Sequence, residues 1–243
     1  MQRFLALPAL CIVLVILAGG SIARGDDARA EVIVLSTLHQ LHDETKGYSF
    51  DVLTAIIEWL EPDILAVELT PADLASRRAQ GTKQEYQHSV FPLLEKKNYA
   101  AIALEPAPPL YDEIVGMLRQ SQQELGNSSP ENAALFNVYV TTLFEYLGEY
   151  WDSPAAVNST ASDMLFESKH RFQSKIFGPV EATAWERWNE HFLRQILTAA
   201  ADNPGKRIVV LVGAEHSYWL RSRLDSSDVT LLDTERLLTE FGQ

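Results

Sequence analysis

The chain contains a single cysteine, Cys11, which lies within an apolar N-terminal run. If that run is removed on export, the remaining chain has no cysteine, which excludes disulfides, thiolate catalysis and cysteine metal sites. Basic residues are also scarce, because 20 Lys and Arg face 33 Asp and Glu, and the formal net charge is −13. A strongly acidic surface repels phosphate backbones, so we expect no nucleic-acid partner.

The N-terminal segment has the pattern of a secretory signal. Met1 to Arg3 form a short basic start, residues 4–20 form an almost unbroken apolar run, and small and polar residues follow up to Ala30. We expect residues 1–25 to direct export, so that the protein is periplasmic, secreted or anchored on the outer side of a membrane. The alternative to cleavage is an uncleaved anchor, because the run is only slightly shorter than the ~20 residues of a spanning helix.

Beyond this signal, short apolar runs alternate with helical patterns. Each run is almost continuously apolar, which indicates strands buried on both faces, as in a parallel sheet. Apolar residues recur at helical spacing over residues 49–60, and residues 71–97 are also interpreted as mostly helical. The predicted strands are Val32–Leu35, Ile64–Val67, Ala101–Leu104, Ile208–Val212 and, more weakly, Val229–Leu232.

This order of strands and helices is typical of a three-layer α/β/α fold with a mostly parallel central sheet. Residues 111–201 contain several helical patterns and no convincing strand, so we expect a helical insertion between strands three and four. A chain of 243 residues supplies one sizeable core. Residues 26–243 are therefore expected to form a single domain with a helical cap.

Ionisable residues follow the predicted strands. His39 follows the first strand, Glu68 ends the second, Glu105 ends the third, and the fourth runs into Gly213-Ala-Glu-His216. Ligands of open α/β sheets bind at the carboxyl ends of the strands, and an ionisable group beside a buried strand is costly unless it is paired, coordinated or solvated. We therefore expect His39, Glu68 and His216 to form an active or binding site, with Glu105 beside them.

Other polar residues are expected to lie outside the central site. His42, Glu215 and Asp233 also lie near strand ends and are interpreted as supporting or structural groups. Three further histidines lie in polar helical stretches, where we expect them to be solvated: His88, His170 and His191.

A further pattern lies ahead of the fourth strand. Residues 186–191 are interpreted as the start of a helix whose apolar stripe includes Trp185 and Trp188. Arg187 and Asn189 lie off this stripe, and taken alone they are expected to be surface residues.

Two histidines and one carboxylate support two kinds of chemistry. As a triad, His39, Glu68 and His216 would bind a divalent metal (Mn, Zn or Fe) with open positions for water. The metal would lower the pKa of that water and polarise a carbonyl. The same groups would also act without a metal, one histidine as general base and the other as acid. Spacing in the sequence does not decide between the two.

The order of these motifs resembles that of the TraB/GumN–Tiki superfamily, whose more distant relatives are erythromycin esterase-like and haem-binding ChaN-like proteins. The resemblance spans residues 32–238 and is carried by small-Thr-x-His, the two strand-end glutamates, a Glu-Arg-x-Asn helix and Gly-x-x-His. It implies a central site and three supporting residues. The central residues are His39, Glu68 and His216, and the supporting ones are Glu105, Arg187 and Asn189.

The resemblance also implies a class of function. Tiki-like members are described as metal-dependent proteases, erythromycin esterase-like members hydrolyse a lactone, and ChaN-like members bind haem. We therefore expect an exported, metal-assisted hydrolase of a peptide or a small molecule, acting on a peptide, ester or lactone bond. Glu105 would act as acid, base or support, and Arg187 would steady a substrate carboxylate or an oxyanion.

Two alternatives to the hydrolase are kept open. The first is a non-catalytic protein that binds haem or a similar ligand in the same cleft, lined by the aromatic residues of the insertion. The second is a scaffold in which the site residues form a structural network.

One position departs from the family pattern, since Ser36 stands where the family has glycine, and serine adopts positive φ less readily than glycine.

Overall fold

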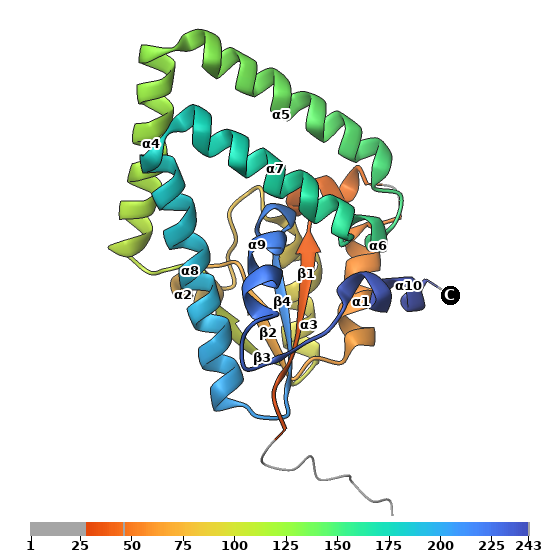
Figure 1. Ribbon diagram of the computed structural model, residues 1–243. Coiled ribbons are helices and arrows are strands. Elements are labelled where there is room, and N and C mark those ends of the chain that lie inside the picture. Colours follow the sequence, from red (N-terminus) through yellow and green to blue (C-terminus); the bar gives the residue numbers. More distant parts are fainter. Residues whose placement is uncertain (1–27, 46, 243) are drawn as a thin grey trace, which may run out of the picture.

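The computed structural model describes residues 28–45 and 47–242, so the predicted signal at residues 1–25 lies outside the described part of the chain. Five parallel strands form one sheet in the order β3-β2-β4-β1-β5 (Figure 1). All five predicted strands are present, with ends within two residues of the prediction. They are β1 (Glu31–Thr37), β2 (Ile64–Val67), β3 (Ala100–Ala103), β4 (Arg207–Gly213) and β5 (Thr230–Leu231).

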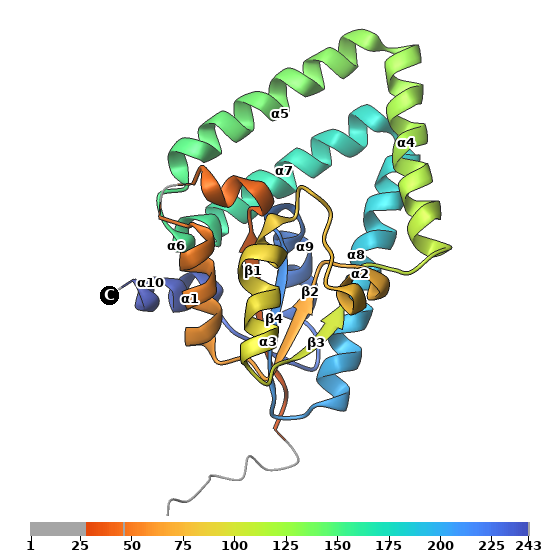
Figure 2. The same ribbon diagram turned by 180° about the vertical axis from the view of Figure 1, so that it is seen from behind.

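The sheet is covered on both faces, which explains the continuous apolar runs. On one face lie α1 (Phe50–Leu60) and α3 (Phe91–Lys96), preceded by the π-helical turn η2 (Tyr86–Val90) (Figure 2). On the other face lie α8 (Pro179–Asp202) and α9 (Ala214–Leu224). The predicted three-layer α/β/α fold is thereby confirmed.

Alternate residues of β1 show how the two layers are held. Ile33 and Leu35 pack with the α1 side, whereas Val32 and Val34 pack with the α8 side, because successive side chains of a strand point to opposite faces. All four residues are buried. Burying such a side chain contributes about 1.5–3 kcal/mol, so the central strands are rigid supports for the residues at their carboxyl ends.

Helix α1 illustrates how local sequence sets these elements. The Ser49 hydroxyl accepts a hydrogen bond from the Val52 N–H, as an N-cap does, and the helix buries Leu53, Ile57 and Leu60 on one face. It ends at Glu61, whose left-handed backbone has φ 48°. The predicted helix over residues 49–60 is therefore present.

The helical insertion between β3 and β4 is also confirmed. It consists of α4 (Leu110–Ser128), α5 (Pro130–Tyr150), α6 (Pro154–Val157), α7 (Thr160–Phe177) and α8. Proline stands at the start of α5, α6 and α8, where its missing N–H is tolerated. The prediction that a helix starts at Glu186 is wrong. Helix α8 already begins at Pro179, directly after Gly178 ends the preceding helix.

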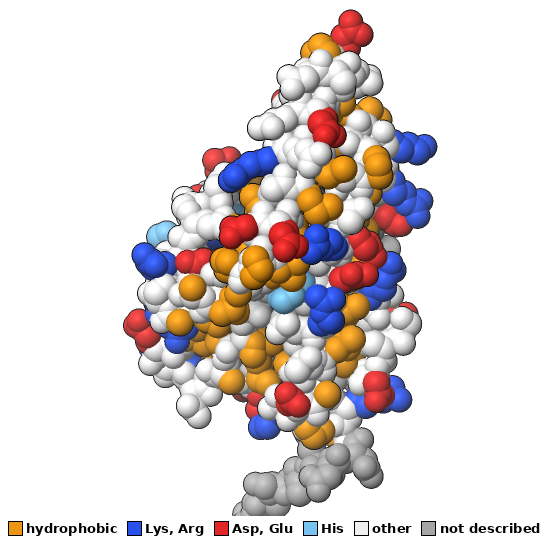
Figure 3. All heavy atoms as spheres, turned by 90° about the vertical axis from the view of Figure 1, so that its left-hand side faces the viewer, with side chains coloured by type: hydrophobic (Ala, Val, Ile, Leu, Met, Phe, Trp, Pro, Cys, Tyr) orange, Lys and Arg blue, Asp and Glu red, His pale blue; other side chains and the backbone are white. Residues whose placement is uncertain are grey.

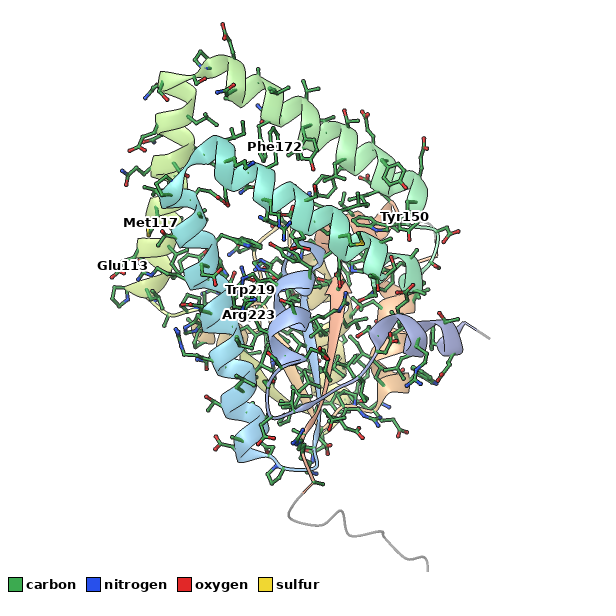
Figure 4. The ribbon with its side chains drawn as sticks, in the orientation of Figure 1. Glu113, Met117, Tyr150, Phe172, Trp219 and Arg223 are labelled. Carbon is green, nitrogen blue, oxygen red and sulfur yellow. The ribbon has the colours of Figure 1, made fainter. Side chains whose placement is uncertain are left out.

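Helices α5 and α7 lie beyond the carboxyl ends of the strands, toward which β1 points (Figure 1). Between them Phe172 of α7 contacts Phe136 and Tyr139 of α5, with ring centroids 6.0 and 5.0 Å away (Figure 4). No helix within the described residues is both long and apolar enough to cross a membrane. Because these ring contacts join α5 and α7, the insertion forms a packed cap above the strand ends.

Candidate functional site

Three predicted residues meet at the carboxyl edge of the sheet. His39 lies in the 3-10 turn η1 (His39–Asp43) after β1, Glu68 directly follows β2, and His216 lies in the first turn of α9 after β4. The Nε2 atoms of both histidines lie 4.0 Å from Oε1 of Glu68. Because β4 pairs with both β1 and β2, the three strand ends are neighbours.

His39 is held by a carboxylate. Its Nδ1 lies 2.6 Å from Oε1 of Glu85, which also accepts a hydrogen bond of 3.0 Å from the Thr37 hydroxyl. Burial disfavours the charged form of His39, but the hydrogen bond to Glu85 and the charges of Glu68 and Glu85 outweigh it, so its pKa is raised. The backbone at His39 is left-handed, with φ 53°, which is uncommon outside glycine and strained.

His216 is held by an amide instead. Its Nδ1 lies 2.8 Å from Oδ1 of Asn189, whose Nδ2 donates to the Trp185 carbonyl at 2.8 Å. This pattern orients the amide, so neutral His216 carries its proton on Nδ1 and a lone pair on Nε2. Burial lowers the pKa of His216 to about 4, although Glu68 acts in the opposite direction. Asn189 is fully buried, so its interpretation as a surface residue is wrong.

Lys83 links the two strand-end glutamates. Its Nζ lies 2.9 Å from Oε1 of Glu68 and 2.7 Å from Oε1 of Glu105, and it donates to the Glu68 carbonyl at 2.8 Å. Burial would raise the pKa of Glu68, but the Lys83 ammonium, the two histidines and the Gly213 N–H hold it well below its ordinary range. The two carboxylates likewise raise the pKa of Lys83 against the effect of its burial.

Glu105 and Gly213 complete this arrangement. Burial raises the pKa of the Glu105 carboxyl, although Lys83 opposes the shift. The Gly213 N–H donates to Oε2 of Glu68 at 2.6 Å. A Cβ at Gly213 would lie 2.7 Å from Nε2 of His39, so the Gly-x-x-His glycine permits this close approach.

Sequence reasoning missed Lys83, Glu85 and Tyr86. They lie between α2 (Pro71–Ser76) and α3, in a stretch that follows no strand end. The Tyr86 hydroxyl accepts from the Glu68 N–H at 2.9 Å and donates to the Leu211 carbonyl at 3.1 Å, which ties this stretch to the sheet. Tyr86 begins the π-helical turn η2, a conformation frequent at functional sites, but the residue pattern does not mark it.

Arg187 does not join the site. Its guanidinium donates to Oε2 of Glu113 at 2.8 Å and to the Met117 sulfur at 3.5 Å, both on α4 (Figure 4). Residues two apart on a helix point in nearly opposite directions, so Arg187 faces away while Asn189 faces His216. Figure 3 shows the side of the molecule on which α4 and α8 lie, where apolar side chains gather near the centre with acidic and basic ones around them. The expected contact of Arg187 with substrate is not supported by its position.

The predicted solvation of His170 is wrong. His170 is only 4% exposed, its Nε2 lies 3.0 Å from Oε2 of Glu215, and Lys169 lies 2.6 Å from the same oxygen. The Trp185 ring stacks between His170 and His216, with centroid distances of 3.7 and 4.7 Å. Stacking against the Trp185 ring explains why His170 is buried. The other two are placed differently, since His88 is exposed and His191 is half-buried.

Two polar residues near strand ends are structural. Buried His42 accepts from the Leu38 N–H at 3.0 Å through Nε2, and its Nδ1 donates to the Tyr48 carbonyl at 2.7 Å. Asp233 accepts from the Arg236 N–H at 3.0 Å and thereby caps α10 (Thr234–Phe241). Neither contact involves the site residues.

Ser36, at the family's glycine position, needs no positive φ. It lies within β1, its N–H donates to Oδ1 of Asn158 at 2.8 Å, and its hydroxyl lies 2.7 Å from that of Ser217. The left-handed residue of this turn is His39. Serine therefore fits here as a buried hydrogen-bonding residue.

Two cavities, each of about 260 Å³, share His216 as a lining residue. The first, here the apolar cavity, contains His39 and the N-terminus of α9 beneath Phe144 of α5 and Phe166 of α7. The rest of its lining includes apolar Leu38, Leu41 and Trp151 and polar Thr37, Gln40, Thr82 and Glu215. The second, here the indole cavity, lies against α4 and α8, and its lining is Glu68, Gln80, Lys83, Glu105, Tyr111, Leu118, Trp185 and Trp188. Both include His216, so a ligand lying across it would reach into each.

The surroundings of Glu68 do not suit a divalent metal. One of its oxygens is 2.9 Å from the Lys83 ammonium and the other accepts from the Gly213 N–H. A fixed cation at this distance repels a second one. Within the described residues, no group of three or more His, Cys, Asp or Glu is arranged to hold a metal ion. The metal expected with His39, Glu68 and His216 stays a prediction.

No protein-family model, curated protein or solved structure matches the chain. The resemblance to the TraB/GumN–Tiki superfamily is therefore carried by the order of the motifs alone.

Proposed function

We propose that the protein is an exported hydrolase that cleaves a peptide, ester or lactone bond by general acid–base catalysis between His216 and His39. One observation carries the proposal. Both histidines present Nε2 to the same oxygen of Glu68, yet one is held by a carboxylate and the other by an amide. Groups whose environments push their pKa values apart are typical of an acid and a base in one site.

His216 has the properties of the base. Its pKa of about 4 leaves it neutral at physiological pH, and the amide of Asn189 keeps the lone pair on Nε2. In the proposed reaction Nε2 takes a proton from water while the water oxygen bonds to the carbonyl carbon of the substrate. Glu68 stabilises the imidazolium that forms, because its negative charge lies 4.0 Å away.

His39 has the properties of the acid. Its raised pKa and the carboxylate of Glu85 favour the protonated ring. When the bond to the leaving group breaks, Nε2 of His39 gives its proton to the departing nitrogen or oxygen. The extra proton on His216 and the one missing from His39 are then exchanged with solvent, which restores both rings.

The N-terminus of α9 is suited to the oxyanion of the tetrahedral intermediate. The first N–H groups of a helix lack intrahelical partners and carry partial positive charge. Ala214 and Glu215 of this first turn line the apolar cavity together with His216, whereas the Gly213 N–H already donates to Glu68. The N–H groups of Ala214 and Glu215 would stabilise the oxyanion, which is the role that was expected for Arg187. The proposal needs no metal, and the export part of it is supported by the N-terminal residue pattern alone.

The test is a hydrolase screen with peptide, ester and lactone substrates on metal-free protein. We expect activity in the wild type, with kcat/KM lowered about 10²–10⁴-fold in both His39→Gln and His216→Gln. His88→Gln is the matched control, because His88 is exposed, and it should leave activity unchanged.

Elemental analysis of the same samples separates the two chemistries. Activity that survives chelation with no bound metal supports the acid–base reaction. Near-stoichiometric manganese, zinc or iron that is lost in both site variants would instead establish the metal site that the sequence predicts. Wild-type activity that is unaffected by either substitution would rule out the histidine pair.

A further inference from the structure

The two cavities that meet at His216 differ in chemistry. The apolar cavity contains His39 and carbon-rich side chains such as Phe144 and Phe166. The indole cavity contains charged Lys83 and Glu105 beside aromatic rings. The exposed lining of both cavities is mostly apolar, and the charged side chains of Lys83 and Glu105 distinguish the indole cavity. A ligand that spans both would therefore be apolar in the first cavity and need a hydrogen-bonding group in the second.

Two buried polar atoms on the indole-cavity side are left without a hydrogen bond. Nε1 of Trp188 and Oε2 of Glu105 have no hydrogen-bond partner among the residues that the structure describes. Glu105 is 2% exposed, and both residues line the indole cavity. Buried polar atoms in native proteins are nearly always paired, so an exception calls for an explanation. A ligand group that accepts from the indole N–H and donates to the carboxylate, as an amide does, would pair both.

The positions of the two histidines indicate which cavity holds the leaving group. His39, the proposed proton donor to the leaving group, lines the apolar cavity. Trp188 and Glu105 line the indole cavity, and His216, the proposed base, lies between the two. The leaving group has to depart beside the acid, whereas the acyl part stays on the other side of the attacked carbon.

We infer that the substrate is a carboxylic amide or ester whose leaving group is apolar and occupies the apolar cavity, while its acyl part places a hydrogen-bonding amide in the indole cavity. This inference rests on the proposed hydrolase. It adds the substrate class, the orientation of the scissile bond, and Trp188 and Glu105 as residues that determine specificity.

Four esters test the orientation: those of N-acetylglycine and of hexanoic acid, each with benzyl alcohol and with ethylene glycol. We expect the benzyl ester of N-acetylglycine to have the highest kcat/KM, because it matches both cavities. A highest value for the hexanoate of ethylene glycol would mean the reverse orientation, and four equal values would mean no such subsites. Either result overturns the inference.

Trp188→Phe probes the polar subsite without removing the ring. Loss of the indole N–H should lower kcat/KM for the N-acetylglycine esters about 5–10-fold and leave the hexanoates unchanged. Trp59→Phe is the control, because Trp59 is on α1 and 42% exposed, and it should change nothing. An equal loss for all four esters in Trp188→Phe would indicate a structural role only.

Binding of fragments separates failure of this inference from failure of the hydrolase. In ¹H–¹⁵N spectra, N-acetylglycinamide should shift the indole signal that Trp188→Phe removes, and benzyl alcohol should shift that of Trp151, which lines the apolar cavity. If both shifts occur but no ester is hydrolysed, the proposed function fails and the two cavities stand as a ligand site. If esters are hydrolysed but Trp188 does not respond to N-acetylglycinamide, the inference fails and the hydrolase stands.

Discussion

Oδ1 of Asn189 lies 2.8 Å from Nδ1 of His216, in a pocket where Asn189 itself is fully buried. An amide oxygen accepts a hydrogen bond without adding charge, so it fixes the tautomer of the imidazole while burial keeps the ring neutral. A carboxylate in the same place would fix the same tautomer but favour the imidazolium. His39 has that second kind of partner in Glu85. The difference between the two partners is what sets the two histidines apart.

Asn189→Asp should therefore change the pH dependence of His216. The new carboxylate raises the pKa of His216 from about 4, because it favours the charged ring. A base must be unprotonated, so the acidic limb of kcat/KM should move to higher pH, with activity near pH 8 retained and activity near pH 5 reduced. Titration of the His216 ring by NMR measures the same shift without substrate.

The control for this prediction is Asn137→Asp on the exposed part of α5, which adds the same charge far from the site. It should leave both the acidic limb and the His216 titration unchanged. An Asn189→Asp variant with an unmoved His216 titration would mean that the amide does not set the state of this ring.

Lys83→Met should destabilise the fold. The change leaves the Glu68 and Glu105 carboxylates buried and close together without their shared cation, and breaking such an arrangement costs about 3–5 kcal/mol. The depressed pKa of Glu68 in the wild type gives stability that is present above the ordinary pKa of 4.5 and lost as pH falls. The difference in unfolding free energy between wild type and variant should therefore shrink toward acidic pH, as urea unfolding at several pH values would reveal.

A double variant, Lys83→Met with Glu105→Gln, is the control. Removing one of the two charges should restore part of the lost stability at neutral pH, because Glu68 no longer faces a second buried carboxylate. A double variant that is less stable than Lys83→Met alone would contradict this electrostatic account.

The fold could be predicted from the sequence because its strands are buried on both faces. Continuous apolar runs such as Val32–Leu35 and Ile208–Val212 result from that burial, and the carboxyl ends of neighbouring parallel strands must converge. That is why residues placed directly after strands, such as His39 and His216, were found together. What those residues do stays a prediction.

The partners of these residues could not be predicted in the same way. Lys83 meets Glu68 across 15 residues and Glu105 across 22, and Asn189 meets His216 across 27. In each case the two partners lie on different segments of the chain, so only the packing of whole elements creates the contacts. Charged and polar residues are mostly exposed in proteins, which made the surface the natural expectation for Asn189.

Gly213→Ala should reduce activity by steric displacement of His39. The backbone of Gly213, with φ −54° and ψ 141°, suits alanine, but the added Cβ would lie 2.7 Å from Nε2 of His39. The ring must move, and a displacement near 1 Å can lower kcat/KM about 10²-fold. Stability should fall by about 1–3 kcal/mol, as overpacking does. Gly148→Ala on α5, where a Cβ meets nothing within 4 Å, should keep activity and stabilise the helix by about 0.5–1 kcal/mol.

The strained backbone of His39 leads to a prediction that separates function from stability. At φ 53° a side chain costs energy that glycine avoids, so His39→Gly should be about 1 kcal/mol more stable than His39→Ala, although both lose activity. The same pair of changes at Glu61, at φ 48° in the C-cap of α1, should give the same difference with activity retained. Equal stability of the two His39 variants would mean that the turn relaxes and that the ring orientation is not held by the backbone.

The stability that the charged His39 contributes should depend on pH with a definite sign. Its pKa is raised in the folded state above the ordinary 6.5, so the contribution is fully present below pH 6.5 and is lost as pH rises through the folded value. The free energy of unfolding of the wild type, relative to His39→Gln, should therefore decline from weakly acidic to alkaline pH. A difference that grows with pH would show that neutral His39 is the form that the fold prefers, and the acid of the proposed reaction would then have to be another group.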